Sequence, residues 1–244
     1  MSKEQNRDKL YSSPRPVIDE FVFDESVAAV FPDMINRSVP AYATIVRMTG
    51  ILCQQYLQPE TNCYDLGCSL GATTLAMEPA VTQKNSRLIA VDNSQPMLDK
   101  LRQRIGNEFP NIIPELADIR DVEIEHASFV TLNFTLQFVP PGERLDLLAR
   151  IRRGMLPKAC LVLSEKVRFN DEDENRIQDE LHTLFKRANG YSELEISQKR
   201  AALENVLIRE TVDQHRSRLI DAGFGRAIQW FQCFNFVSLI ALND

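Results

Sequence analysis

No stretch of this sequence is apolar over the roughly 18 to 20 residues that a membrane-spanning helix needs. The first sixteen residues lack the apolar segment of a secretory signal. The five cysteines form no C-x-x-C pair, and the three histidines lie too far apart in the chain for a zinc motif. These absences predict a cytoplasmic protein that keeps its thiols reduced, avoids membranes and has no metal site.

Positive charge is also in short supply. Lys and Arg number 28 and Asp and Glu 34, so the formal net charge is −6. Proteins that bind nucleic acid over a broad surface neutralise phosphates with Lys and Arg, so this balance argues against such a surface. We expect no direct nucleic-acid binding, although a local basic patch stays open.

The composition is otherwise that of a globular protein, with 44% hydrophobic and 25% charged residues in 244. A chain of this length can bury a sizeable core, and the hydrophobic content excludes disorder over most of it. We predict one domain over residues 1–244. Within it we expect a mobile arm at 1–16, N-terminal helices at 17–57 and a helical insertion at 170–209.

Short apolar runs alternate with helix-forming stretches between residues 62 and 165. Such alternation indicates βαβ units and a parallel sheet. The last two apolar runs are joined by a short polar connection, which is typical of a hairpin. We therefore predict an α/β fold with a mostly parallel seven-stranded sheet and a C-terminal antiparallel hairpin. The predicted strands are 63–66, 88–91, 112–116, 128–134, 160–164, 228–231 and 236–242.

Prolines and capping residues mark the ends of several predicted elements. Pro32 and Pro40 are expected to break the N-terminal region into short helices. Pro114 cannot donate a ladder hydrogen bond, so its strand suits only an edge of the sheet. Ser192 with Glu195 forms a capping-box pattern at the start of a helix in the insertion.

The insertion carries two sets of apolar residues at helical spacing. We expect one set to cover a cleft and the other to meet a second subunit, which predicts a homodimer. The two sets are Ile177, Leu181 and Leu184, and Leu194, Leu203 and Val206.

A glycine-containing turn and an acidic residue follow the first two predicted strands. Residues 65–71 read D-L-G-C-S-L-G, and Asp92 ends the second strand. Ligands of doubly wound sheets bind beyond the carboxyl ends of the strands, where a glycine lets the backbone approach them. A carboxylate at Asp92 can accept hydrogen bonds from both hydroxyls of a ribose. A tight turn and a helix cap are the alternatives; together the two features favour an adenosine cofactor.

Two more polar residues follow or end the next strands. Asp118 comes after the third strand and could accept a bond from the adenine amine. Asn133 lies inside an apolar strand, where its amide must find partners. Those partners are either the backbone or a ligand in the cleft.

Glycine, two acids and an asparagine on successive strands resemble the S-adenosylmethionine-dependent methyltransferase fold. The G-x-S-x-G loop departs from the G-x-G-x-x-G of dinucleotide enzymes. The acid after the third strand and the terminal hairpin are further differences from those enzymes. A sulfonium cofactor has no pyrophosphate, so this loop need not form a phosphate cradle.

The resemblance narrows to the carboxy-S-adenosyl-L-methionine synthases, whose motifs are spread over nearly the whole chain after the arm. The stretch in the insertion is the most specific, because general methyltransferases lack it. The matching stretches are 31–35 with 37–40, 64–77, 132–138, 185–200 and 230–236.

The resemblance implies a homodimer that carboxylates the methyl group of S-adenosylmethionine with prephenate and releases phenylpyruvate. A separate enzyme uses the product, carboxy-S-adenosyl-L-methionine, to build uridine-5-oxyacetic acid at the tRNA wobble position. Tyr42 and Arg200 are the implied catalytic residues, with Arg200 facing the new carboxylate. The implied cofactor contacts are Tyr42, Gly67, Cys68, Ser69, Asp92, Asn93, Asp118, Ile119, Asn133 and Arg200.

Two other functions remain open from the residues. An ordinary methyltransferase would use the same cofactor residues, but it needs no cation such as Arg200 near the methyl group. A non-catalytic subunit that delivers the cofactor to a partner would keep the same cleft. Without the resemblance, Tyr42 could equally pack in the core, and Arg200 would be a solvated helix charge. Cys68 is interpreted as a small buried thiol.

Overall fold

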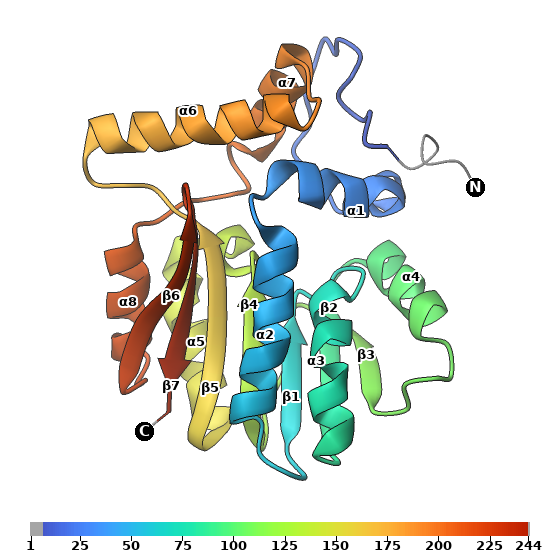
Figure 1. The fold of residues 1–244 in the computed structure, drawn as a ribbon, viewed down its shortest axis with the longest axis vertical. Coiled ribbons are helices and arrows are strands. Elements are labelled where there is room, and N and C mark those ends of the chain that lie inside the picture. The colour runs from blue at the N-terminus through green and yellow to red at the C-terminus, as the bar shows by residue number, and fades with distance from the viewer. Residues whose placement is uncertain (1–6, 244) are drawn as a thin grey trace.

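A computed structural model describes residues 7–243 and contains one seven-stranded sheet with the order β3-β2-β1-β4-β5-β7-β6 (Figure 1). Strands β1 to β5 are parallel, and β7 pairs antiparallel with both β5 and β6. The predicted fold class, including the C-terminal hairpin, is confirmed. The strands are β1 (Asn62–Leu66), β2 (Arg87–Asp92), β3 (Ile112–Leu116), β4 (Ala127–Asn133), β5 (Met155–Lys166), β6 (Arg226–Cys233) and β7 (Phe236–Leu242).

The burial of each strand follows its place in the sheet. Central strands β1, β2 and β4 are buried on both faces, as parallel strands covered by helices must be. Strand β3 is buried only at Ile112 and is half-buried or exposed beyond it, as fits its place at one edge of the sheet. Pro114 lies in β3, opposite Ala90. Because proline has no backbone N–H to donate to a further strand, it suits this edge position.

Helices cover both faces of the sheet. On one face α2, α3 and α4 pack over a core that includes Cys53, Met77 and Leu101. On the other face α5 and α8 contribute Leu148 and Leu219 to the larger core. The α-helices are α1 (Glu25–Ser38), α2 (Tyr42–Tyr56), α3 (Ala72–Gln83), α4 (Gln95–Ile105), α5 (Arg144–Gly154), α6 (Glu172–Ala188), α7 (Glu193–Leu203) and α8 (Val212–Asp221).

Local capping explains where several helices begin. The Ser192 hydroxyl accepts from the Glu195 N–H, and the Glu195 side chain accepts from the Ser192 N–H, so the predicted capping box is present.

One prediction is wrong: Pro32 lies inside α1 and does not end it. The helix runs on to Ser38, and Pro40 then separates it from α2. The ring of Pro32 is exposed, and a single lost bond is offset where a helix packs on its neighbours.

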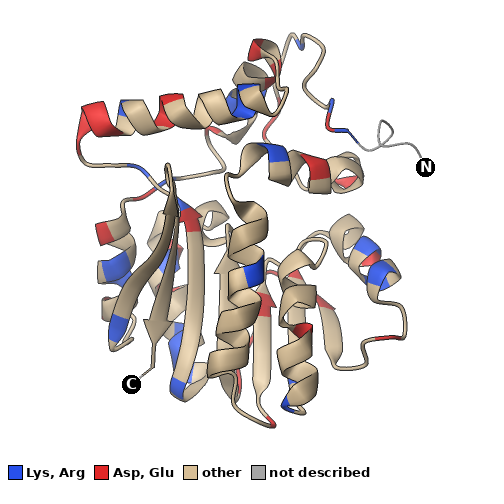
Figure 2. Cartoon of the chain, in the orientation of Figure 1, with Lys and Arg blue, Asp and Glu red and all other residues tan. Residues whose placement is uncertain are grey.

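Helices α1, α6 and α7 lie beyond the sheet, across the carboxyl ends of its parallel strands (Figure 1). The expected insertion at 170–209 thus forms a helical layer over that edge. Charged residues of both signs are spread over these helices and the outer faces of the others, while the sheet is largely uncharged (Figure 2). Between residues 7 and 243 we find no helix whose length and apolar content would let it cross a membrane.

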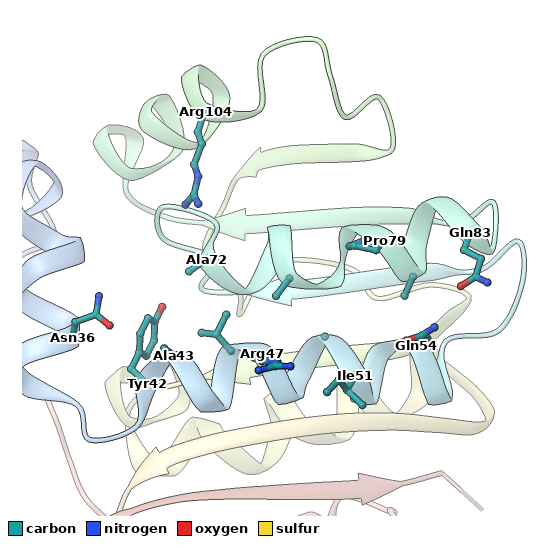
Figure 3. A pocket seen from close by; sticks show the side chains of 14 residues that line it. Asn36, Tyr42, Ala43, Arg47, Ile51, Gln54, Ala72, Pro79, Gln83 and Arg104 are labelled. Atoms are coloured by element: carbon teal, nitrogen blue, oxygen red, sulfur yellow. The ribbon is translucent and has the colours of Figure 1, made fainter.

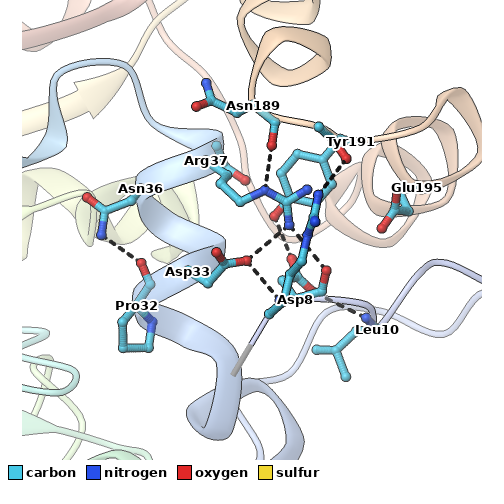
Figure 4. A network of polar contacts seen from close by, with 12 residues as sticks. Asp8, Leu10, Pro32, Asp33, Asn36, Arg37, Asn189, Tyr191 and Glu195 are labelled. Atoms are coloured by element: carbon cyan, nitrogen blue, oxygen red, sulfur yellow. Dashed lines mark hydrogen bonds and ion pairs between the residues drawn. The ribbon is translucent and has the colours of Figure 1, made fainter. Parts of the chain in front are cut away.

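The expectation of a mobile arm is wrong for residues 7–16, which are docked on α1 and the insertion (Figure 4). Asp8 is only 2% exposed, and its N–H donates to Asp33 at 2.8 Å. The Tyr191 hydroxyl donates to the Asp8 carboxylate at 2.6 Å. Gln198 donates to the backbone carbonyl of Tyr11 at 2.9 Å. Residues 1–6 of the expected arm lie outside the described residues.

Candidate functional site

A cavity of about 910 Å³ opens beyond the carboxyl ends of the parallel strands, beneath α1 and the insertion. It lies where the strand order reverses between β1 and β4, the position at which doubly wound sheets bind ligands. The fold brings nine of the ten predicted contact residues to its wall. They are Tyr42, Gly67, Cys68, Ser69, Asp92, Asn93, Asp118, Ile119 and Asn133.

The turn after β1 approaches the cavity with its backbone. Gly67 has φ +83°, and a Cβ there would lie 2.3 Å from the Thr135 side chain, so only glycine fits. The N–H groups of Gly67 and Cys68 both donate to the Val91 carbonyl at 2.9 Å. Ser69 also has a positive φ of 51°. Left-handed backbone at a non-glycine residue is costly, and such strain gathers at ligand sites.

Asp92 holds this turn against the end of β2. Its carboxylate accepts from the Ser69 N–H at 2.8 Å and from the Ser94 N–H at 2.9 Å. Burial raises the pKa of Asp92, and these two bonds oppose the rise. Each oxygen keeps a free lone pair, so both can still accept from ribose hydroxyls. The helix-cap alternative and the ligand hypothesis are therefore compatible in one residue.

Asp118 is more heavily engaged than the sequence suggested. The Arg120 guanidinium donates to both of its oxygens, at 2.7 and 2.9 Å, and the Arg120 N–H donates at 2.9 Å. The hydrogen bond from Arg120 lowers the pKa of Asp118. The Asp118 Oδ2 atom keeps one lone pair for a ligand donor such as an adenine amine.

Asn133 finds its partners on side chains. Its amide donates to the Thr73 hydroxyl at 3.1 Å and accepts from the Ser164 hydroxyl at 2.6 Å. Ser164 also lies 2.9 Å from the Ser238 hydroxyl of β7. This network fixes the orientation of the amide at the cavity wall.

Tyr42 begins α2 at the border of two hollows. Ala41 before it has φ 57°, and Phe134, 6.4 Å from the Tyr42 ring, has φ 61°. Burial raises the pKa of the Tyr42 hydroxyl, so it stays a neutral donor. Figure 3 shows the second hollow, a groove of about 570 Å³ between α2 and α3 that Arg47 and Arg104 also border.

The thiols are reduced and mostly buried. Cys53 and Cys63 lie 4.0 Å apart between their sulfur atoms, too far for a disulfide. Burial raises the pKa of the Cys68 thiol, which therefore stays protonated at the cavity wall. Among residues 7–243 we find no cluster of three or more His, Cys, Asp or Glu side chains suited to a metal ion.

Arg200 is the predicted residue that this chain does not bring to its cavity. It lies on α7, is exposed, and donates to the Thr183 hydroxyl at 3.5 Å, outside the cavity wall. Neighbouring positions on one helix face different sides, and Lys199 takes the inward side. In the single chain Arg200 is therefore not part of the cavity wall, and its expected contact with the carboxylate and its role in catalysis stay predictions.

Sequence reasoning missed a basic cluster on the β5 side of the cavity, formed by Lys166, His182, Lys186 and Lys199. Burial lowers the pKa of Lys166 to about 7 and the pKa of Lys186 and of Lys199 to about 8. Burial, together with the positive charges of Lys166 and Lys186, lowers the pKa of His182 to about 2. Two features of the sequence indicate this cluster. Lys166 follows a predicted strand, and Lys186 and Lys199 lie in the family-specific stretch 185–200.

Comparison with solved structures identifies the class of fold. Human N-acetylserotonin methyltransferase in complex with S-adenosylmethionine matches 90% of this chain and 55% of its own, with a TM-score of 0.59 and 15% identity. The cyclopropane synthase MmaA2 from Mycobacterium tuberculosis matches 78% and 63%, with a TM-score of 0.57 and 16% identity. The family model described as a methyltransferase domain matches residues 64–158. The fold is thus the S-adenosylmethionine-dependent methyltransferase fold.

Sequence relatives narrow this class to one family. The carboxy-S-adenosyl-L-methionine synthase of Trichlorobacter lovleyi is 52% identical over 97% of this chain and 98% of its own. That of Marinobacter nauticus is 52% identical over 99% and 97%. The chain belongs to the carboxy-S-adenosyl-L-methionine synthase family. It is an enzyme that uses S-adenosylmethionine.

Proposed function

We propose that this protein converts S-adenosylmethionine and prephenate into carboxy-S-adenosyl-L-methionine and phenylpyruvate. The observation that carries the proposal is one cavity that joins the Gly67 turn and Asp92 to a cluster of buried cations. Such a cavity suits two ligands at once, a sulfonium nucleoside and a small anion. An ordinary methyltransferase has no need for the second, cationic half.

The proposed chemistry balances without an added oxidant or metal. The sulfonium centre acidifies the methyl group, which loses a proton to give an ylide. Prephenate loses its ring carboxyl group and its ring hydroxyl as the ring becomes aromatic. The ylide carbon forms a bond to the carboxyl carbon, and the methyl proton and the hydroxyl leave as water. The protein has to hold both molecules in register and exclude water.

Side chains on the cavity wall can hold and orient the two molecules. Asp92 and the Gly67 turn would orient the nucleoside, and Asn133 has an amide already fixed by Thr73. Tyr42, a neutral hydroxyl at the wall, would donate to the carboxylate that forms. We therefore propose the nine cavity residues as the cofactor site.

The product would serve a separate enzyme that installs uridine-5-oxyacetic acid at the tRNA wobble position. The net charge of −6 supports a small-molecule role for this chain, with no tRNA contact of its own. A cytoplasmic location and the absence of a membrane role belong to the same proposal.

We also propose that the chain works as a homodimer. Ile177 and Leu184 on α6 are 47% and 53% exposed, while Leu203 and Val206 line the cavity. The exposed pair on α6 supports the proposal that one apolar set of the insertion meets a second subunit, while the other set lies over the cavity. Because Arg200 faces outward, it would reach a carboxylate only in the cavity of a second copy.

Mass spectrometry of the products tests the proposed reaction. Incubation with both substrates should yield an S-adenosylmethionine derivative in which a carboxyl group replaces one methyl hydrogen, together with phenylpyruvate. Methyl-carbon-labelled S-adenosylmethionine should carry its label into that product. Release of S-adenosylhomocysteine with a methylated acceptor would instead favour an ordinary methyltransferase. Tight binding without any turnover would favour a cofactor-delivering subunit.

A further inference from the structure

Two of the three cavity lysines have no acidic partner. Lys199 lies 3.1 Å from the Ser38 hydroxyl and 3.7 Å from the Asp8 carboxylate. Among residues 7–243, no carboxylate oxygen lies within 4.0 Å of the Lys166 or Lys186 ammonium. Asp179 is the nearest source of negative charge for both, and it is bonded to Arg209 at 2.7 Å.

Two uncharged aromatic rings lie beside Lys166 on the cavity wall. The Lys166 ammonium lies 5.9 Å from the centre of the Phe236 ring, and the His182 ring stacks edge-on to the same ring at 4.9 Å. His182 donates its Nε2 proton to the Ser38 carbonyl at 2.8 Å, which fixes the neutral tautomer. The Phe236 ring gives Lys166 a cation–π contact, but neither ring carries the negative charge that would pair with the two ammonium groups.

Buried cations without a partner are costly, and the cost is recovered when an anion joins them. Because both ammonium groups line the cavity, the missing anion can come from a ligand. We propose that Lys166 and Lys186, with Lys199 beside them, form the subsite for the carboxyl donor and bind its α-keto acid side chain. This inference rests on the proposed function, because it assumes that prephenate is the donor.

The choice between the two carboxylates of the donor follows from the chemistry. The ring carboxyl group has to leave its carbon and reach the sulfonium methyl group. Lysines that held that group would stabilise the reactant and slow its release. The α-keto acid group is unchanged in phenylpyruvate, and its carboxylate and keto oxygens offer adjacent acceptors to two ammonium groups.

The location separates this subsite from the cofactor site. The Gly67 turn follows β1, Asp92 ends β2 and Asp118 follows β3, all on one side of the switch point. Lys166 ends β5, and Lys186 belongs to α6 above it. The two ligands would therefore meet near the end of β4, where Asn133 lies.

Kinetics of Lys166→Gln, Lys186→Gln and the double variant test the subsite. Each single change should raise the KM for prephenate on the order of 30-fold, as for loss of one half of a buried charge pair. The inhibition constant of phenylpyruvate should rise in parallel, while the dissociation constant of S-adenosylmethionine stays unchanged. Lys158→Gln is the matched control, because Lys158 is exposed near the other end of β5. The KM of this variant for prephenate should stay at the wild-type value.

Thermal unfolding distinguishes a binding role from a structural one. Replacing an unpaired buried cation should leave the unfolding temperature unchanged or raise it, and Lys186→Arg should retain most of the affinity for prephenate. An unchanged KM in the Gln variants overturns the subsite. A parallel loss of S-adenosylmethionine affinity also overturns it, because the lysines would then bind the carboxylate of the cofactor. A wild-type enzyme that does not bind or use prephenate overturns the proposed function, and this subsite with it.

Discussion

Asp65 shows how one residue next to the cofactor turn is tuned by its surroundings. It is 1% exposed, and the Thr74 hydroxyl donates to it at 2.6 Å. Burial raises the pKa of Asp65 to about 7, and the charge of Asp92 adds to the rise. The sequence predicts only that Asp65 lies in the strand 63–66, next to the glycine-containing turn. A neutral acid here avoids two adjacent negative charges beneath the turn.

This pKa makes the stability of the protein depend on pH in a defined window. Asp65 is protonated in the folded state up to about pH 7 but ionises near 3.8 when unfolded, so folding binds a proton between these values. The stability from the neutral acid is therefore present below pH 4 and lost as the pH rises through 7. Over this pH range the unfolding free energy of the wild type should fall by up to about 4 kcal/mol relative to that of the Asp65→Asn variant.

Urea denaturation of both proteins at pH 4, 5.5, 7 and 8 measures this difference. Because Asp92 is present in both proteins, the difference reports Asp65 together with its interaction with Asp92. A difference in unfolding free energy that stays constant with pH would mean that Asp65 is ionised throughout.

At the scale of elements, the insertion α6–α7 has three roles. It covers the cavity with Lys186 and Lys199, it receives the N-terminal segment, and it exposes Ile177 and Leu184. Asp8 joins the first two roles, because it pairs with Lys199 and accepts from Tyr191 (Figure 4).

Removing the Asp8 carboxylate should destabilise the protein. Asp8→Ala leaves the Lys199 ammonium and the Tyr191 hydroxyl buried without that partner. We expect a loss of about 2 to 5 kcal/mol in unfolding free energy, as for other broken buried pairs. Urea denaturation measures it, with Asp19→Ala as the control, since Asp19 lies just beyond the docked residues 7–16 and is exposed. Equal midpoints for the two variants would show that the segment is not held by Asp8.

At the scale of the whole molecule, the outward position of Arg200 makes the oligomeric state a question about catalysis. A homodimer would have a mass of 2 × 27.9 = 55.8 kDa, which light scattering can distinguish from the single chain. In a two-fold dimer, each subunit can offer Arg200 to the cavity of the other. A monomer at micromolar concentration would contradict this arrangement.

Mixing two inactive variants tests whether Arg200 acts across subunits. Arg200→Ala lacks the proposed catalytic cation, and Asp92→Ala lacks the proposed ribose acceptor, so each variant alone should lose activity. A mixed dimer then contains one site with Asp92 from one chain and Arg200 from the other. After unfolding and refolding together in equal amounts, roughly a quarter of wild-type activity should return, since half of the dimers are mixed and each has one intact site. No recovery would mean that Arg200 acts within its own chain or only in folding.

The sequence by itself determined those features that depend on local chemistry. Capping at Ser192, the edge strand with Pro114 and the turn at Gly67 all follow from backbone donors, missing donors and the space a Cβ needs. The alternation of strands and helices determined the parallel sheet, and strand ends placed Asp92 and Asn133 at one edge. These features involve residues close together in the chain, or rules shared by all sheets of this kind.

Only the tertiary structure decided which way long charged side chains point and what they meet. Lys199 and Arg200 are adjacent on α7, yet one is buried in the cavity and the other is exposed. The docking of Asp8 likewise depends on Tyr191, more than 180 residues away. A lysine or aspartate has the same local preference in water and in a buried pair, because its burial cost and its partner are set by packing of distant segments. The basic cluster on the cavity wall therefore depends on the packing of β5, α6 and α7 against one another.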